Sequence, residues 1–430
     1  MKRRLKKEQT KLIYILLFLF TSFLFTKAQH TVLKNLNLLD VINGKTITGK
    51  AISIQNGVIA QIDELAKIEI TKSTKLIDLK NQFVSPGLYD MHLHLPHHHK
   101  LDTFLNTILA AGVTNVRIMY SEEDVVKMKK QIDRKTIKPT IYYPYILTDS
   151  VDLNQPTELM RVLRETKSKG LQFIKLYSAQ TRNDFSETTF LNFMKAANAS
   201  EITICGHYPG KIKYPIVAQS GFKSIEHLAV LPNQTDSLLT NYIELTRLNQ
   251  LYTCPTLDWF NIAYLIPYPK GYLSRVTLYN APKHYFTKWQ KQNKKNAEDF
   301  SIDSLKKYQP KFKMAFEKRL TVLKKLHDAG CLLIVGGESD LEYQLEGFNV
   351  YEEMMIWKKA GIPDAEILKS ATYIPSTFFK EQNQYGSIEL GKIAQLAIFS
   401  KNPLTNIENI KTIHATFLNN TLLLKKDLLK

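Results

Sequence analysis

Between residues 84 and 373 the chain alternates short apolar runs with longer stretches of helical texture. Short apolar runs are typical of strands buried on both faces, and their regular alternation with helices favours parallel β/α units. Eight such runs occur, at 83–84, 114–119, 140–143, 173–177, 202–205, 224–227, 251–254 and 332–335. Since eight parallel strands close a barrel, we predict an α/β fold with a (β/α)₈ TIM barrel.

Both ends of the chain have β texture instead. In 29–84, two alternating segments meet at Asn56-Gly57, a strong signal for a tight hairpin turn. After Tyr373, short apolar segments return at 386–389, 394–399 and 412–417. We therefore expect one small β-sandwich domain built from both chain ends, residues 29–84 and 374–430. The barrel, residues 85–373, would be inserted between them.

One stretch within the barrel is longer than an ordinary connection between a strand and a helix. Residues 260–325 are rich in Tyr, Lys and Gln, with helical texture near 312–326. We expect an elaborated insertion there.

The first 28 residues have a different character. Five basic residues precede position 8, residues 12–25 are almost wholly apolar, and Ala28 follows. A basic start, a short apolar core and a small exit residue predict a secretory signal peptide at 1–28. The apolar run of about 14 residues is short for a membrane span, which needs ~20. We expect a periplasmic or secreted protein with no stable membrane insertion after signal removal; an uncleaved anchor stays open as an alternative.

Composition excludes several other classes. Residues 1–28 hold seven Lys/Arg and one Glu, so without them the net charge falls from +18 to +12. The remaining lysines are scattered and no aromatic–basic pattern accompanies them, which argues against nucleic acid as a partner. Cys205, Cys254 and Cys331 are widely spaced in apolar runs, so they predict buried thiols rather than a disulfide framework or paired zinc ligands.

The histidines indicate the chemistry. His92 and His94 are two apart on an extended segment, so their side chains share one face. His207 and His227 come at the ends of two later predicted strands. Because these strand ends lie on one rim of a barrel, and imidazole is the commonest protein ligand for metals, the four histidines predict a divalent-metal site.

Lys175 is unusual because it lies in the middle of a strongly apolar strand. An ammonium group is costly to bury there. Either Lys175 is paired with a carboxylate or lies at a rim, or it is deprotonated or modified for function.

Several segments together resemble the metal-dependent amidohydrolase superfamily, in particular its prolidase- and imidazolonepropionase-like branch. The matching segments are 84–95 (VSPGLYDMHLHL), 111–117 (AGVTNVR), 173–175 (FIK), position 207, 221–227 (GFKSIEH) and 386–394 (GSIELGKIA). The resemblance implies that His92 and His94 bind a first metal ion and His207 and His227 a second. Lys175 would be carboxylated and bridge both ions, which would be two Zn²⁺ per chain.

The match departs from the family pattern after the eighth predicted strand. The family has Gly-Thr-Asp there, whereas this chain has Gly336-Gly337-Glu338-Ser339-Asp340. Glu338 is favoured at the position of the family's Asp, because the preceding strand then keeps its usual length. Asp340 stays as the alternative. Three consecutive histidines at 97–99 are a further departure. They form a surface loop, contact the substrate or bind metal adventitiously.

The resemblance implies hydrolysis of an amide, cyclic amide or dipeptide-like bond of a small-molecule substrate. Glu338 or Asp340 would serve as general base, and Tyr177 and Tyr208 would contact the substrate. Lactone, ester or phosphoester hydrolysis and mononuclear deamination stay open on the same scaffold, although Lys175 favours the binuclear branch. The alternative of a different class is a barrel protein that has lost catalysis and only binds its ligand. The sequence is also compatible with a homo-oligomer.

Overall fold

The computed structural model describes residues 30–177, 185–265, 275, 278–280, 282–299, 302–339 and 343–430. The predicted signal peptide at 1–28 and Asp340 lie outside the described residues. No helix in these ranges is both long enough and apolar enough to cross a membrane.

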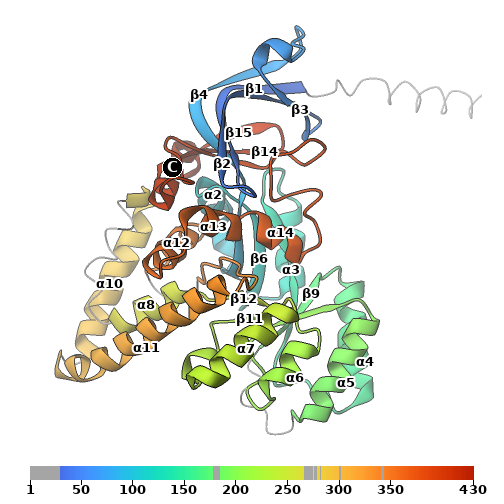
Figure 1. Ribbon diagram of the computed structural model, residues 1–430, viewed down its shortest axis with the longest axis vertical. Helices are drawn as coiled ribbons and strands as arrows, with labels where there is room; N and C mark the ends of the chain where they lie inside the picture. Colours follow the sequence, from blue (N-terminus) through green and yellow to red (C-terminus); the bar gives the residue numbers. More distant parts are fainter. Residues whose placement is uncertain are drawn as a thin grey trace, which may run out of the picture.

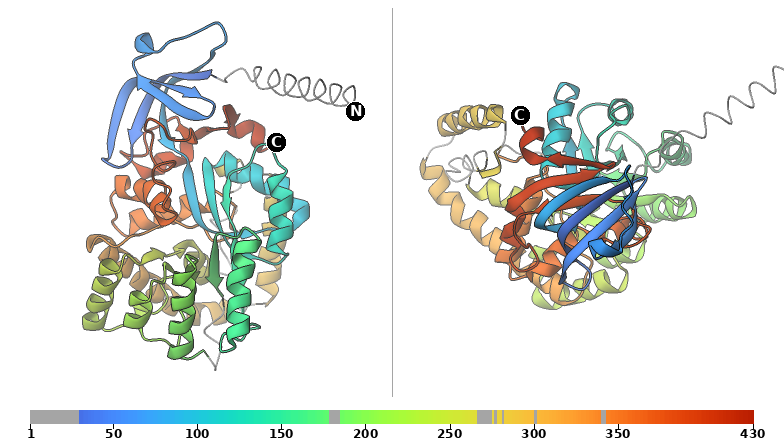
Figure 2. Two further views of the ribbon diagram at one scale, coloured as in Figure 1. Left: turned by 90° about the vertical axis from the view of Figure 1, so that its right-hand side faces the viewer. Right: turned by 90° about the horizontal axis from the view of Figure 1, so that it is seen from above.

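Strands from the two chain ends form one seven-stranded sheet at one end of the molecule (Figure 1). Viewed from above, the N-terminal strands lie beside the C-terminal ones (Figure 2). In spatial order they are β15 (Thr421–Leu424), β14 (Ile413–Leu418), β13 (Leu396–Phe399), β4 (Lys75–Pro86), β1 (His30–Asp40), β2 (Lys45–Gln55) and β3 (Val58–Asp63). The two ends join where β4 pairs antiparallel with β13, which confirms the predicted domain built from both ends.

The predicted hairpin at Asn56-Gly57 is present. Strands β2 and β3 pair antiparallel up to Gln55 and Val58, and both turn residues have positive φ, +51° and +83°. Such a turn matches the right-handed twist of the flanking strands. By contrast, residues 386–389 do not form a strand. Left-handed glycines at positions 386 and 391 turn the chain there, so that expectation was wrong.

The barrel is built from two sheets and one irregular closing segment. One sheet has the order β5 (Leu88–Leu95), β6 (Val113–Ser121), β7 (Thr140–Tyr142). The other has the order β12 (Tyr252–Cys254), β11 (Ser224–Glu226), β10 (Thr203–Gly206), β9 (Phe173–Leu176), β8 (Pro144–Leu147). All of these pairs are parallel, which confirms the predicted (β/α)₈ class.

Two of the predicted barrel strands differ from the structure. Residues 83–84 belong to β4 in the seven-stranded sheet, and the first barrel strand is β5, which carries the histidine pair. The predicted strand at 140–143 is shortened to β7, and a separate strand, β8, begins at Pro144, which has no N–H to donate to a ladder.

The eighth position of the barrel is held by residues 332–335. The Thr253 N–H donates to the Leu332 carbonyl, and the Ile334 N–H donates to the Thr253 carbonyl, both at 3.0 Å. On the other side, the Met91 N–H donates to the Val335 carbonyl at 3.0 Å. These bonds close the barrel between β12 and β5.

Helices cover the outside of the barrel (Figures 1 and 2). Between the strands run α2 (Leu101–Ala110), α3 (Val125–Asp133), α4 (Pro156–Ser168), α5 (Glu187–Ala199), α6 (Tyr214–Gln219), α7 (Asp236–Leu248) and α8 (Leu257–Leu265). After these come α10 (Lys283–Asp299), α11 (Ile302–Asp328), α12 (Asn349–Lys359), α13 (Asp364–Ser370), α14 (Tyr373–Phe378) and α15 (Lys425–Leu428). Short 3₁₀ turns are η1 (Leu65–Lys67), η2 (His98–Lys100), η3 (Leu231–Asn233) and η4 (Ile407–Thr412). The described part of the predicted insertion is mostly helical, and its long helix α11 packs on α8, α12 and η3.

The barrel interior is apolar toward the amino ends of the strands. A buried cluster there contains Tyr89, Met91, Met119, Tyr142, Phe173, Cys205, Tyr252, Cys254, Ile334 and Phe378. This plug fills the lower part of the barrel. The polar and ionisable interior residues are therefore gathered toward the carboxyl ends of the strands, where TIM barrels carry their active sites.

Candidate metal centre and active site

A bulge in β5 directs its histidines into the barrel. Between Asp90 and Leu93 the strand advances three residues while its partner β6 advances only two. The extra residue lets Met91 and His92 both face the interior, because a bulge shifts the alternation of side chains by one. Leu93 then packs outward in the shell around the barrel, and His94 again faces inward.

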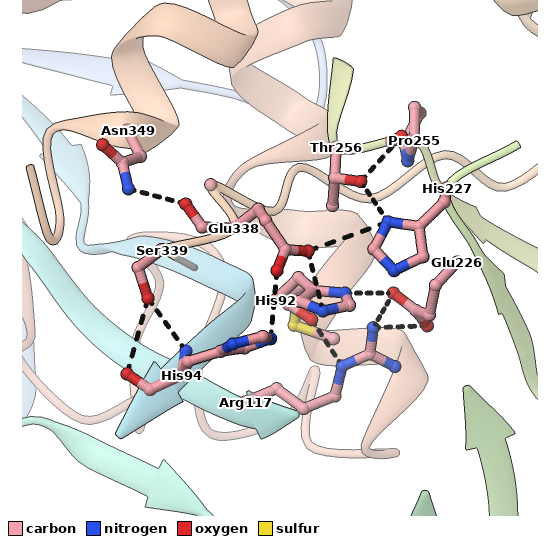
Figure 3. Close-up of polar contacts among 12 residues, drawn as sticks. His92, His94, Arg117, Glu226, His227, Pro255, Thr256, Glu338, Ser339 and Asn349 are labelled. Atoms are coloured by element: carbon pink, nitrogen blue, oxygen red, sulfur yellow. Dashed lines mark hydrogen bonds and ion pairs between the residues drawn. The ribbon is translucent and has the colours of Figure 1, made fainter. Parts of the chain in front are cut away.

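His92, His94 and Glu338 converge at one point (Figure 3). The Nε2 atoms of His92 and His94 each lie 3.0 Å from a different carboxylate oxygen of Glu338. Burial alone would raise the pKa of Glu338, but the two imidazoles outweigh it and hold that pKa well below its usual value. The histidine pair predicted from spacing therefore meets Glu338, the acid that the sequence favoured over Asp340.

The loop that carries Glu338 lies tightly against β5. A Cβ atom at Gly336 would lie 2.5 Å from the Cys254 sulfur and 2.7 Å from the His92 Cβ. Glu338 itself has a φ of +48°, which is uncommon for a non-glycine residue. Its N–H donates to the His92 carbonyl at 2.8 Å, and the Asn349 side chain donates to its carbonyl at 2.7 Å. These bonds hold the strained backbone in place.

Asp90 ties the same loop to the strand. Its carboxylate accepts the Gly337 N–H at 2.8 Å and the His92 N–H at 3.1 Å. Burial raises the pKa of Asp90 to about 6 despite these bonds.

A buried ion pair beneath the centre orients His92 (Figure 3). The His92 Nδ1 lies 2.9 Å from Glu226, and the Arg117 Nη2 donates to both oxygens of that carboxylate at 2.8 and 2.9 Å. Arg117 also donates to the Met91 carbonyl and to Ser224. Burial alone would raise the pKa of Glu226, but Arg117 outweighs it and that pKa is strongly lowered.

This arrangement fits a bound cation. Since Glu226 is a carboxylate, the His92 Nδ1 carries the proton and donates it, which leaves a lone pair on Nε2. That lone pair faces a carboxylate oxygen of Glu338 at 3.0 Å, an arrangement that is repulsive unless a cation or a proton lies between them. Tetrahedral zinc with ligand bonds of ~2.0–2.2 Å spaces its ligand atoms by roughly 3.4 Å, close to the separations here.

Arg117 and Glu226 were missed as functional residues from sequence. Both lie inside segments that carried the family resemblance, as charged residues in apolar strands. The same signal had drawn attention to Lys175.

A second group of metal-binding atom types, His92, Glu226 and Cys254, is also close together. Glu226 is already neutralised by Arg117. Burial raises the pKa of the Cys254 thiol well above its usual value, so the sulfur stays protonated. The group is therefore the support of the centre rather than a second centre.

Lys175 is completely buried beside the histidines. Its Nζ has no hydrogen-bond partner in the described part of the chain, and it lies 5.0 Å above the centre of the Tyr177 ring. Burial lowers the pKa of Lys175 to about 8, against the opposing pull of the Glu338 and Glu226 carboxylates. The neutral, nucleophilic amine therefore forms at a lower pH than in an ordinary lysine.

His207 and His227 form the other side of the site. Their ring centres are 5.1 Å apart, and His227 is 4.8 Å from the His92 ring. Burial lowers the pKa of His207 to about 2 and that of His227 to about 3, so both rings are neutral. The His227 Nδ1 lies 2.6 Å from the Thr256 hydroxyl, which itself donates to the Pro255 carbonyl. His227 therefore donates through Nδ1 and leaves a lone pair on Nε2.

The two tyrosines predicted to contact substrate lie in different places. Tyr177 lines the cavity, and its ring centre lies 5.2 Å from the ring centre of His207. Tyr208 does not line it: its hydroxyl donates to the Ile212 carbonyl and its ring stacks on Tyr214. The Tyr208 side chain is thus occupied in packing outside the cavity.

The cavity above these residues has a volume of about 390 Å³, within the range of small-molecule sites. Its lining residues are His94, Lys175, Tyr177, His207, His227, Leu228, Ala229, Val230, Pro232, Asn233, Trp259, Phe260, Arg319 and Glu338. The 97–99 triplet is not among them. His97 and His98 are more than half exposed and contact Glu122 and Glu123.

Comparison with known proteins agrees with this geometry. The chain matches the profile of the amidohydrolase family over residues 83–422. A Xaa-Pro dipeptidase with bound methionine in its active site shares 18% identity, with a TM-score of 0.68 over 92% of this chain and 100% of the other. A Bifidobacterium longum protein assigned as a prolidase shares 18% identity, with a TM-score of 0.69 over 92% of this chain and 94% of the other. Molinate hydrolase shares 14% identity, with a TM-score of 0.67 over 94% of this chain and 96% of the other.

One characterised sequence also matches in part. Adenine deaminase from Methanocaldococcus jannaschii is 32% identical over 93 residues, which cover 20% of this chain and only 16% of the deaminase. The solved structures share the fold across nearly the whole chain, and the family profile covers the whole barrel and most of the C-terminal strands. The chain therefore belongs to the amidohydrolase family, hydrolases that act on carbon–nitrogen bonds.

Proposed function

We propose that this protein hydrolyses an amide, cyclic amide or dipeptide-like bond with the help of two divalent cations, most simply Zn²⁺. The observation that carries the proposal is the meeting of His92 and His94 Nε2 atoms with the Glu338 carboxylate. The neutral imidazoles of His207 and His227 and the buried Lys175 support a second ion beside it. The solved Xaa-Pro dipeptidase of the same fold is consistent with cleavage of an amide bond.

Each residue has a distinct role in this proposal. His92, His94 and Glu338 would hold one ion, and His207 and His227 the other. The neutral Lys175 Nζ would add carbon dioxide and release a proton, and the resulting carbamate would be a ligand for the cations. Cations held there lower the pKa of a water molecule toward ~7 and polarise the amide carbonyl.

Glu338 is the group that moves the proton. One of its carboxylate oxygens accepts a proton from the attacking water, and the same oxygen then gives it to the leaving amine nitrogen. The Glu226–Arg117 pair keeps His92 in the tautomer whose Nε2 faces the site. Tyr177, on the cavity wall, would orient the substrate.

A substrate panel tests the reaction type. The protein is stripped with a chelator and then restored with Zn²⁺, Mn²⁺ or Co²⁺. Both forms are assayed on dipeptides, cyclic dipeptides, lactams and lactones. We expect hydrolysis of at least one amide that is lost on chelation and restored by metal. Activity on lactones alone would instead favour an esterase, and metal binding without any hydrolysis would favour a binding protein.

Metal content tests the role of Lys175. We expect Lys175→Ala to hold one ion per chain where the wild type holds two, because the bridging ligand is gone. Loading of the stripped wild type should be faster with added bicarbonate and faster at pH 8 than at pH 6, since only the neutral amine adds carbon dioxide and the pKa of Lys175 is about 8. Lys223→Ala, a half-buried lysine outside the cavity, is the matched control. Equal loading by Lys175→Ala and wild type would contradict the carbamate.

We also propose that residues 1–28 direct export of the chain. Mass spectrometry of protein recovered outside the cytoplasm should find an amino terminus at Gln29. An intact Met1 on that protein would contradict cleavage.

A further inference from the structure

Arg319 is a cation at the cavity that the proposed mechanism does not use. It lies on α11, within the insertion, and lines the cavity together with Trp259 and Phe260 of α8. Because α11 packs on both α8 and η3, the guanidinium is fixed at the wall of the site.

The guanidinium stacks by its face on an aromatic ring and keeps one N–H group without a partner among the described residues. Its Cζ lies 3.8 Å from the centre of the Phe260 ring, a stacking arrangement, and Nη1 donates to the Ala315 carbonyl at 3.0 Å. Its Nε is buried and has no hydrogen-bond partner among the described residues. No carboxylate in the described ranges lies within ion-pair distance of it. Burial without a counterion lowers the pKa of Arg319.

The charges in the cavity favour an anion. Glu338 is the one acid among the described lining residues, and His92 and His94 already contact both of its oxygens. A partly buried arginine without a partner is costly, and a planar carboxylate that accepts two N–H bonds would satisfy it.

The wall beside Arg319 is apolar. Leu228, Val230, Pro232 and the aromatic rings of Trp259 and Phe260 line that part of the cavity. A ligand that suits both features has a carboxylate next to an apolar side chain, as at the C-terminal end of a dipeptide.

We propose that Arg319 binds the carboxylate of the substrate, so that the preferred substrates are dipeptides or N-acyl amino acids with an apolar C-terminal residue and a free carboxylate. This inference rests on the proposed amide hydrolysis and narrows its substrate class. Arg319 is then a specificity residue on the insertion, remote from the proton transfer itself.

The test uses the metal-loaded full-length enzyme and four dipeptides, alanine followed by leucine, phenylalanine, methionine or proline, each paired with its C-terminal amide. We expect kcat/KM to favour the free acid by about 10- to 100-fold, the range of one charge-assisted hydrogen-bonded pair. In Arg319→Met this ratio should fall toward one, and Arg319→Lys should keep part of it. Lys318→Met removes the same charge from the neighbouring exposed position of α11 and should keep the full ratio.

Binding separates this inference from the proposed function. If no dipeptide is hydrolysed, peptide hydrolysis fails, and titration calorimetry with L-leucine and L-leucinamide still tests Arg319. Tighter binding of leucine by the wild type, lost in Arg319→Met, would uphold the carboxylate site. An acid-to-amide ratio that Arg319→Met leaves unchanged, or equal binding of both ligands by the wild type, would overturn it. Circular dichroism confirms that each variant is folded.

Discussion

Replacing Glu338 with Gln is expected to lower kcat/KM by about 10²- to 10⁴-fold, the usual contribution of a general base. Gln has nearly the same shape but cannot accept the proton, and its amide N–H₂ could not bind a cation between His92 and His94. Steady-state kinetics on the best amide of the panel would measure the loss, with metal content determined on the same samples. Glu338→Asp, which restores the family's usual acid with a shorter reach, should be less affected than Glu338→Gln.

Asp340→Asn is the comparison that assigns the base. The contacts of Glu338 with both histidines lead us to expect the larger loss in Glu338→Gln. A larger loss in Asp340→Asn would assign the base to Asp340 instead. Equal activity in both variants would mean that neither acid is the base.

Arg117→Met is expected to destabilise the metal-free protein by about 3–5 kcal/mol, because it leaves the Glu226 carboxylate buried without its partner. Both residues are fully buried, so solvent cannot replace the lost contact. Urea unfolding of chelated protein would measure the effect apart from any loss of metal. Glu226→Gln should cost a similar amount, and the double variant should cost less than the two single losses together.

The pair also sets a dependence on pH. The pKa of Glu226 is lowered in the folded protein, so its contribution to stability is present above the unfolded-state pKa of ~4.5 and is lost as the pH falls below it.

The surface pair Arg247–Glu244 is the matched control for Arg117→Met, since both of its side chains are more than 40% exposed. Arg247→Met should leave the free energy of unfolding nearly unchanged, because solvent screens an exposed pair. An equal cost for Arg117→Met would show that the buried pair carries no special weight.

Much of the fold could be predicted from sequence because apolar runs and turn residues report local structure directly. The hairpin at Asn56-Gly57 and the alternation of strands with helices are local patterns of this kind. The first barrel strand was less visible, since β5 has polar residues inside it and a bulge breaks its alternation. The eighth position was found as an apolar run, although only a few backbone bonds join it to the barrel.

The site was predictable where one residue type in an unusual place carries information. His92 and His94 on one face, and Lys175 in an apolar strand, are examples. The contact between Glu226 and Arg117 joins β11 to β6 and could not be read from either strand alone. Arg319 is one of many basic residues along its helix, and only the packing of α11 against α8 places it at the cavity.

The most direct test of the account is anomalous X-ray scattering from crystals grown with Zn²⁺. We expect one zinc peak within ~2.0–2.2 Å of the Nε2 atoms of His92 and His94 and of the Glu338 carboxylate. A second peak should lie between His207 and His227, with a carboxylated Lys175 joining the two. Zinc-loaded crystals with no peak at His92, His94 and Glu338 would contradict the proposed centre.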